Sequence, residues 1–428
     1  MKLLLPICAA LLLSAAAGAQ ERGYTFSSDV DFFTRGEVRG DGLANGESGK
    51  DLAAFLLQRT ALGLQFSRGI LDLRASAQFS TTWGGGSNLS MYEAWAQLTP
   101  VKGLQIRAGR QNLSYDDQRI FGSDNWAVTG MSHDVLKIAY EGFGHKAHIF
   151  AAYNQNPENI AGGSFYQNGL LPYKTLQGVW YHYDIPKVHV GGSLLFANIG
   201  MQGGDSAEKA SMNYQQVAGV YLSSAQKRWS AEASFYYQFG RHETGLPLQA
   251  WMTSVKGGFK PVGSLEIRAG YDHLSGDPYF AVPGQGQIGM IQHKVIRGFS
   301  SVYGSHHKFY GAMDFFYVQN YLNGFTPGLQ NAYLGLCWTY KDKLSMEGAY
   351  HFLATSAKLE NLKRPLGHEV EFSTAWKIYK DIKLSAGYTF MVGSSTMEAL
   401  QRTAGKNLLH WGWVMFSVSP RLFTVGKK

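Results

Sequence analysis

The sequence is poor in cysteine and proline, and after residue 20 it has no long apolar run. Only Cys8 and Cys337 occur, and Cys8 lies in a segment that we expect to be removed, so the mature chain has no partner for an intramolecular disulfide. No later stretch approaches the apolar length of a membrane-spanning helix. The formal net charge is +8, but lysine and arginine are scattered and form no run typical of nucleic-acid binding. These absences argue against a disulfide-stapled domain, a helical membrane protein and a nucleic-acid-binding protein.

The N-terminus has the pattern of a secretory signal peptide. Lys2 precedes an apolar run over residues 3–17, and residues 17–19 read Ala-Gly-Ala. A positive start, a short apolar run and an A-x-A cleavage site predict a signal peptide at 1–19 and a mature chain at 20–428. The alternative is an uncleaved anchor, for which this run is too short to span a bilayer comfortably. We therefore expect an exported protein.

Much of the remaining sequence alternates between apolar and polar residues. In W-S-A-E-A-S-F-Y-Y-Q-F, residues 229–239, every odd position is apolar, whereas the even positions carry Ser, Glu, Tyr and Gln. A period of two predicts a β-strand with one apolar and one polar face. The same alternation recurs at 62–66, 71–79, 265–271, 344–352, 370–378 and 382–390.

The connections between strands alternate in length. Short ones fall near 67–70, 99–103, 142–145, 184–187, 223–227, 261–263, 341–343 and 379–381, and long ones near 37–54, 83–89, 112–132, 155–173, 199–212, 240–248, 275–328, 355–367 and 393–406. Eight short and nine long connections make seventeen, which implies eighteen strands. Short turns at one end and long loops at the other are typical of outer-membrane barrels. The sequence therefore predicts an all-β fold, a transmembrane antiparallel up-and-down β-barrel of about 18 strands in the outer membrane of a Gram-negative cell.

Two alternatives bear on this fold. Residues 308–318 also look like a strand, but counting them would give an odd number, so we place them inside the external loop 275–328. A soluble barrel would bury the apolar face instead of presenting it to lipid, and alternation alone does not separate the two. The signal peptide, the strand number and the loop asymmetry favour the membrane barrel, with outer-membrane lipid as its partner.

One stretch is more specific than barrel wall. Residues 109–126 read G-R-Q-N-L-S-Y-D-D-Q-R-I-F-G-S-D-N-W and are followed by S-H-D at 132–134. This stretch resembles the signature of the alginate-export family of outer-membrane porins, and Y-G-x-x-H-K-F-Y-G-x-M-D at 303–314 resembles its relatives from the Bacteroidetes. The chain departs from the family pattern at Met131, where Arg is common, and at Asp116, where Gly is frequent. The matching positions are Gly109, Arg110, Gln111, Tyr115, Asp117, Arg119, Gly122, Trp126 and Asp134.

The resemblance implies a monomeric barrel whose arginine-lined constriction passes an anionic polysaccharide. From resemblance and strand parity together, the candidate anion pathway is Arg59, Arg74, Arg107, Arg110, Arg119, Lys137 and Arg268. A ring of like charge in a pore selects ions of the opposite sign. The same parity also carries acids: Glu232, Glu266, Glu347, Glu369 and Glu371. The expected solute is an anionic saccharide or a small anion.

The competing interpretation is that the lumen bases are structural. Arg268 would pair with Glu266, and Lys377 with Glu371, giving a general diffusion porin of mixed selectivity or a non-conducting structural barrel. Arg110, Asp117 and Arg119 would then serve to fold residues 112–132 into the mouth of the barrel.

Enzyme chemistry is not expected. A barrel lipase needs a serine nucleophile, a histidine base and an orienting acid, and His133-Asp134 belongs instead to the family motif. Asp116-Asp117 has no further ligand at suitable spacing, so we predict no metal and no cofactor. Cys337 lies on lumen parity and is expected to be chemically quiet. The solute and the direction of transport are left open.

Overall fold

The computed structural model describes residues 23–40, 52–155, 172–204, 206, 208–278, 295–305, 307–314, 326–401 and 408–427. The signal peptide at 1–19 lies outside these residues and stays a prediction. The strands are β1 Tyr24–Gly40, β2 Ala53–Arg68, β3 Leu71–Thr82, β4 Ser87–Val101, β5 Leu104–Gln111, β6 His133–Gly142, β7 His145–Tyr153, β8 Thr175–Ile185, β9 Val190–Gly203, β10 Ser211–Ala225, β11 Trp229–Arg241, β12 Pro247–Val262, β13 Leu265–Leu274, β14 Leu329–Tyr340, β15 Leu344–Ala354, β16 Pro365–Tyr379, β17 Ile382–Gly393, β18 Leu408–Val418 and β19 Arg421–Lys427. A short helix, α2 Ser395–Gln401, precedes β18. Within this described part, no helix has the length and apolar character needed to cross a membrane.

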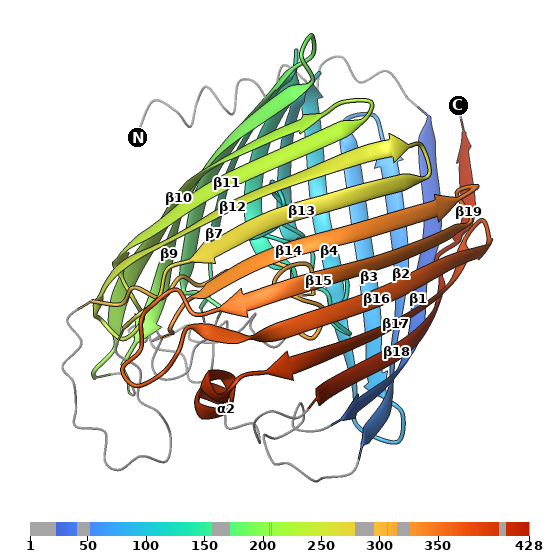
Figure 1. Cartoon of the computed structure of the whole chain (residues 1–428). Helices are drawn as coiled ribbons and strands as arrows, with labels where there is room; N and C mark the ends of the chain where they lie inside the picture. The colour runs from blue at the N-terminus through green and yellow to red at the C-terminus, as the bar shows by residue number, and fades with distance from the viewer. Residues whose placement is uncertain are drawn as a thin grey trace.

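The strands close into one antiparallel barrel (Figure 1). From β1 to β18 each strand pairs with the next one in sequence, and β1 closes the ring by pairing with β2 on one side and with β18 and β19 on the other. β18 and β19 follow one another along β1, interrupted at Ser419 and Pro420. Because proline has no N–H to donate, it splits this last strand in two. If β18 and β19 are counted as one interrupted strand, the nineteen labelled strands form an eighteen-stranded barrel, as predicted.

The connections confirm the predicted asymmetry. The turns 69–70, 102–103, 143–144 and 380–381 lie at the barrel end where β1 starts and β19 finishes, and the long loops lie at the other end (Figure 1). One loop that we expected to be long, near 83–89, is a turn of four residues, 83–86. Its Gly85 N–H donates to the Thr82 carbonyl at 2.9 Å, and Gly84 has a φ of 77°, so glycine allows a tight reversal there.

The wall has the predicted two faces. On β11, Trp229 and Phe235 are 50% and 44% exposed, whereas Ser234 and Gln238 are 5% and 2% exposed. The apolar parity therefore faces outward, toward lipid, and the polar parity faces inward, as in other membrane barrels. A soluble barrel would have the reverse arrangement.

Two loops fold back into the barrel and join there. Residues 112–132, between β5 and β6, meet residues 295–314, between β13 and β14, through a parallel bridge of Phe121 with Tyr303. The Gly122 N–H donates to the Tyr303 carbonyl at 2.9 Å, and the Tyr303 N–H donates to the Ile120 carbonyl at 3.0 Å. We call the described residues of these two segments the inner bridge. The part of 308–318 that is described, 308–314, belongs to it and is not a strand, as expected.

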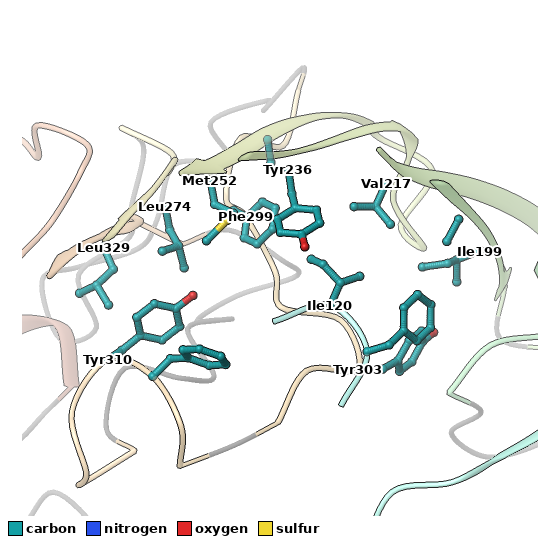
Figure 2. Packing of buried hydrophobic residues seen from close by; sticks show 14 of the residues in the cluster. Ile120, Ile199, Val217, Tyr236, Met252, Leu274, Phe299, Tyr303, Tyr310 and Leu329 are labelled. Carbon is teal, nitrogen blue, oxygen red and sulfur yellow. The ribbon is translucent and has the colours of Figure 1, made fainter. Parts of the chain in front are cut away.

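The inner bridge carries an apolar core inside the barrel, which the sequence did not predict. Ile120, Phe299 and Tyr303 pack against inward side chains of the wall, among them Val217 and Met252 (Figure 2). These wall positions are apolar on both faces of their strands because one face meets lipid and the other meets the bridge. The expectation of a polar lumen is therefore wrong for this part of the wall.

Candidate functional site

The first anchor of the inner bridge is Asp116. Its carboxylate accepts hydrogen bonds from Trp180 Nε1 on β8 and from the Tyr236 hydroxyl on β11, each at 2.8 Å. Its φ of 54° explains why the family often has glycine here, and aspartate is among the few other residues that tolerate this region. Burial raises the pKa of Asp116 above the ordinary aspartate value. The hydrogen bonds from Trp180, Ser193 and Tyr236 act to lower this pKa, but burial outweighs them.

The second anchor is Arg119, whose side chain is only 2% exposed. It donates to Asp117 Oδ2 at 2.8 Å and to Asp272 Oδ1 on β13 at 2.7 Å. It also donates to Ser254 Oγ and to the Tyr310 hydroxyl, both at 2.9 Å. Burial acts to lower the pKa of Arg119, but the charges of Asp272, Tyr310 and Asp117 outweigh it and raise the pKa above the usual arginine value. Arg119 therefore joins both segments of the bridge to the wall and is too buried to meet a solute.

The third anchor lies on the opposite wall. The Arg35 guanidinium of β1 sits 3.9 Å from the Trp126 ring centre and donates to the Trp126 carbonyl at 2.8 Å. The His307 ring stacks on the Trp126 ring, with ring centres 3.9 Å apart. The ring centre of Trp413 of β18 lies 5.0 Å from that of Trp126. Since β1 and β18 are neighbours and β8 to β13 lie across the ring, the inner bridge spans the lumen.

The remaining motif residues also shape this bridge. The Tyr115 ring stacks on Trp180 at 5.0 Å, and Gln111 Nε2 donates to the Val135 carbonyl at 3.0 Å. Gly109 has a φ of 117°, and a Cβ there would lie 2.2 Å from the Ala94 carbonyl oxygen. The structure thus places most of the family motif in one architectural unit that narrows the pore.

The predicted pathway residues divide into paired and unpaired bases. Arg59 Nη2 donates to Asp31 at 2.7 Å, and Arg74 pairs with both Asp29 at 2.5 Å and Glu93 at 3.1 Å. Their charges are neutralised within the wall, as the structural interpretation expects.

Arg110 does not line the pore. On β5 and β6 the outward parity is marked by Leu136 and Ile138, which are exposed, and Arg110 pairs in register with Asp134 on that same parity. Its guanidinium donates to Asp134 at 2.9 and 2.7 Å. The sequence interpretation failed here because the motif suggested a pore residue while strand parity placed it outside.

Arg268 lies in a cavity of balanced charge. This cavity, about 610 Å³, lies between β11–β17 and residues 307–312 of the bridge. Arg268 lies 3.0 Å from Glu266 and 3.8 Å from Glu347, and Lys256 lies 2.9 Å from Glu232. The suggested Arg268–Glu266 pair is thus confirmed. The suggested Lys377–Glu371 pair is wrong, because Glu371 accepts from His351 instead.

Two lumen-facing pairs of bases have no acid partner. Arg107 and Lys137 stand directly opposite each other on β5 and β6, and among the described residues neither has a carboxylate within ion-pair distance. Arg107 donates instead to Gln97 Oε1, at 2.9 and 2.6 Å, and its guanidinium lies 3.9 Å from the Trp95 ring centre. Like charges directly opposite in an antiparallel pair are destabilising. The placement of these two bases opposite each other therefore needs a reason outside the wall.

The second pair is Lys377 and Lys383, opposite each other on β16 and β17. They line a cavity of about 570 Å³ near the short-turn end, next to the tip of the bridge at Trp126. The same lining also contains two further lysines and three aspartates: Lys343, Lys380, Asp31, Asp342 and Asp381. No salt bridge is formed by these lysines with any residue that the structure describes.

The lipase and metal-site chemistry considered for the sequence can be compared with the described residues. His273-Leu274-Ser275 has the His-x-Ser spacing of barrel lipases, which the sequence interpretation overlooked. The Ser275 hydroxyl accepts from the Trp251 N–H and donates to the Arg297 carbonyl, while His273 stacks on the Trp251 ring. No group of three metal-binding side chains is found in this described part.

Comparison with known proteins decides the family. Residues 81–355 match the alginate export family, which is more than half of the 428-residue chain. The chain belongs to the alginate export family. This agrees with the motif, whose residues 109–134 lie within the match. A search of curated proteins finds no match.

Solved outer-membrane porins share the fold of this alginate export family member. Pseudomonas aeruginosa OccK2 (OpdF), in complex with glucuronate, is 12% identical with a TM-score of 0.62, over 93% of this chain and 97% of that chain. A BenF-like porin from Pseudomonas fluorescens Pf-5 is 12% identical with a TM-score of 0.63, over 93% and 99%. Pseudomonas aeruginosa OpdK with vanillate is 8% identical with a TM-score of 0.59, over 93% and 99%. These likenesses show that the chain has the fold of outer-membrane porins.

Proposed function

We propose that this barrel conducts anionic solutes, acidic saccharides or small carboxylates, past the unpaired bases of its lumen. The observation that carries the proposal is the Arg107–Lys137 pair, because its like charges are unfavourable in the empty wall and favourable with an anion between them. A second unpaired set, Lys377 and Lys383, lies toward the short-turn end. Bases on both sides of the ring would raise the local concentration of anions in the lumen.

The chemistry of the pair suits a carboxylate. A guanidinium and an ammonium side by side offer N–H donors to both oxygens of one carboxylate. Gln97 fixes the Arg107 guanidinium through Nε and Nη2, which leaves Nη1 for a passing anion. Arg107 is half-buried beside Trp95, so bulk electrolyte screens it less than it would screen a loop charge.

Two comparisons support the class of solute. The OccK2 structure contains glucuronate and the OpdK structure contains vanillate, and both are small carboxylates. Family membership adds export of a uronic-acid polymer as a candidate activity. We further infer that the barrel works as a monomer.

A competing function is a diffusion porin of mixed selectivity, favoured by the balanced cavity around Arg268 and Glu266. Uptake into liposomes separates the two. With Arg107 and Lys137 intact, glucuronate should enter faster than glucose, and R107Q/K137Q should lose that preference while still admitting glucose. Equal entry of the two sugars through the unaltered protein would favour the mixed porin, and entry of neither would favour a non-conducting barrel.

A further inference from the structure

The outer face of the barrel along β11 to β18 differs from the rest in its charged and polar residues. The outward positions of these described strands hold no Asp or Glu. Three of them hold histidines, His273, His368 and His410, each within three residues of the long-loop end of its strand, at Leu274, Pro365 and Leu408. By contrast, the outward Arg110 of β5 is neutralised by Asp134.

Each of these histidines meets a tyrosine on the same face. Tyr350 lies with its hydroxyl 2.7 Å from His368 Nδ1, and Tyr388 with its hydroxyl 2.5 Å from His410 Nδ1. The Tyr271 hydroxyl donates to Gln330 Oε1 at 2.8 Å and lies 3.4 Å from His273 Nδ1. In all three, Nδ1 is engaged and Nε2 has no hydrogen-bond partner among the described residues.

At His368 and His410 the tyrosine determines what the free nitrogen presents. When the tyrosine hydroxyl donates to Nδ1, the neutral imidazole carries its proton on Nε2 and becomes a donor there. At His273 the Tyr271 proton is given to Gln330, so this ring offers an Nε2 donor when it is protonated. When the histidine is protonated, Nε2 is again a donor. Only the neutral form with its proton on Nδ1 lacks this donor, and an anion in contact with Nε2 would disfavour that form.

Further donors lie beside the histidines. Arg364, one residue before β16, is exposed and close enough to act electrostatically on Tyr271 and His273. Trp251 stacks on His273 with ring centres 4.7 Å apart and planes 5° apart, so an apolar ring adjoins the donors. Below them, outward residues such as Phe372 are exposed to the acyl region.

We propose that this arc, His273, His368, His410 and Arg364 with their tyrosines, docks phosphate-bearing glycolipids of the outer leaflet. The occupant follows from charge and position: the donors ring the level of the lipid headgroups, no carboxylate on the strands competes, and the apolar strands below accept acyl chains. Phosphate accepts from both ring N–H and guanidinium donors. The inference is independent of the solute that the lumen passes.

Native mass spectrometry of the full-length barrel in detergent tests it, with diphosphorylated lipid A and its dephosphorylated form as probes. The unaltered protein should retain the phosphorylated lipid at least about fivefold better. H273F/H368F/H410F keeps an aromatic ring at each site but removes the donors, and it should lose that preference. R364Q should lower it partially.

The matched control is His145, which has the same tyrosine contact at the opposite end of the barrel, with Nδ1 2.7 Å from the Tyr181 hydroxyl. H145F should retain the phosphorylated lipid as the unaltered protein does. Equal retention of both lipids by the unaltered protein, unchanged retention by the triple variant, or the same loss in H145F would each overturn the proposal. Heat-modifiable migration of every variant establishes that the barrel is folded.

Discussion

At the scale of single residues, Arg119 contributes most to the narrowing of the lumen. It is the one described cation here with two buried carboxylate partners, Asp117 and Asp272. Removing one partner of a buried ion pair costs about 3–5 kcal/mol because the remaining charges are left uncompensated. Substitution of Arg119 should therefore destabilise the inner bridge before it affects the barrel wall.

We expect R119A to release the inner bridge without unfolding the barrel. Single-channel conductance in planar bilayers should rise, and protease should cut within residues 112–132. R68A, an exposed arginine at the short-turn end of β2, is the control and should behave like the unaltered protein. Loss of heat-modifiable migration in R119A would show instead that Arg119 supports the wall itself.

Asp116 gives the bridge a pH dependence. Because burial raises its pKa in the folded protein, the protonated carboxyl fits the fold better than the carboxylate. Its stabilising contribution is fully present below the ordinary aspartate pKa and is lost as pH rises through the raised folded value.

In hydrogen exchange corrected for intrinsic rates, protection of residues 112–132 should therefore decline from about pH 4 upward. D116N tolerates the same left-handed backbone and does not ionise, so its protection should be flat over this range. A parallel decline in D116N would assign the effect to another group.

At the scale of elements, the strands were predictable and the bridge was not. Alternation at 229–239 and 382–390 fixes both the strand and the face that it presents, because a period of two depends only on local sequence. The joining of 112–132 to 295–314 depends on contacts nearly two hundred residues apart, such as Arg119 with Tyr310 at a separation of 191 residues. The local sequence pattern does not predict contacts of this kind.

The same limit applies to the candidate site. Parity alone correctly put Arg107 and Lys137 in the lumen, but their register, which places them opposite each other, required the structure. Arg110 was misplaced because its motif was given more weight than its parity. The pairing of Arg74 with Asp29 and Glu93 joins three strands, and no local sequence pattern predicts it.

Gly122 tests whether the two segments of the bridge act as one element. A Cβ there would lie 2.3 Å from Ser305 Oγ and 2.6 Å from the Ser305 backbone nitrogen, so alanine would push the segments apart. Overpacking of this kind costs about 1–3 kcal/mol. G122A should speed proteolysis in both 112–132 and 295–314, whereas G86A, where a Cβ meets nothing within 4 Å, should not. Cutting in one segment only would mean that they open separately.

At the scale of the whole molecule, the lumen is a barrel crossed by a bridge, with most bases neutralised and a few left free. Selectivity should therefore follow the free bases and not the total number of arginines. Each free base in a narrow, partly desolvated pore should have a large effect on ion selectivity. Screening over about 8–10 Å acts mainly on charges in bulk electrolyte.

The most direct test is the reversal potential across a bilayer under a gradient of potassium chloride. R107Q/K137Q should lose most of the anion preference, whereas R74Q and R268Q, whose charges are already paired, should change selectivity little and lower stability instead. Correct folding of each variant is checked by heat-modifiable migration. If R107Q/K137Q keeps the reversal potential of the unaltered protein while R268Q shifts it, the unpaired bases are not the anion pathway and the proposal is wrong.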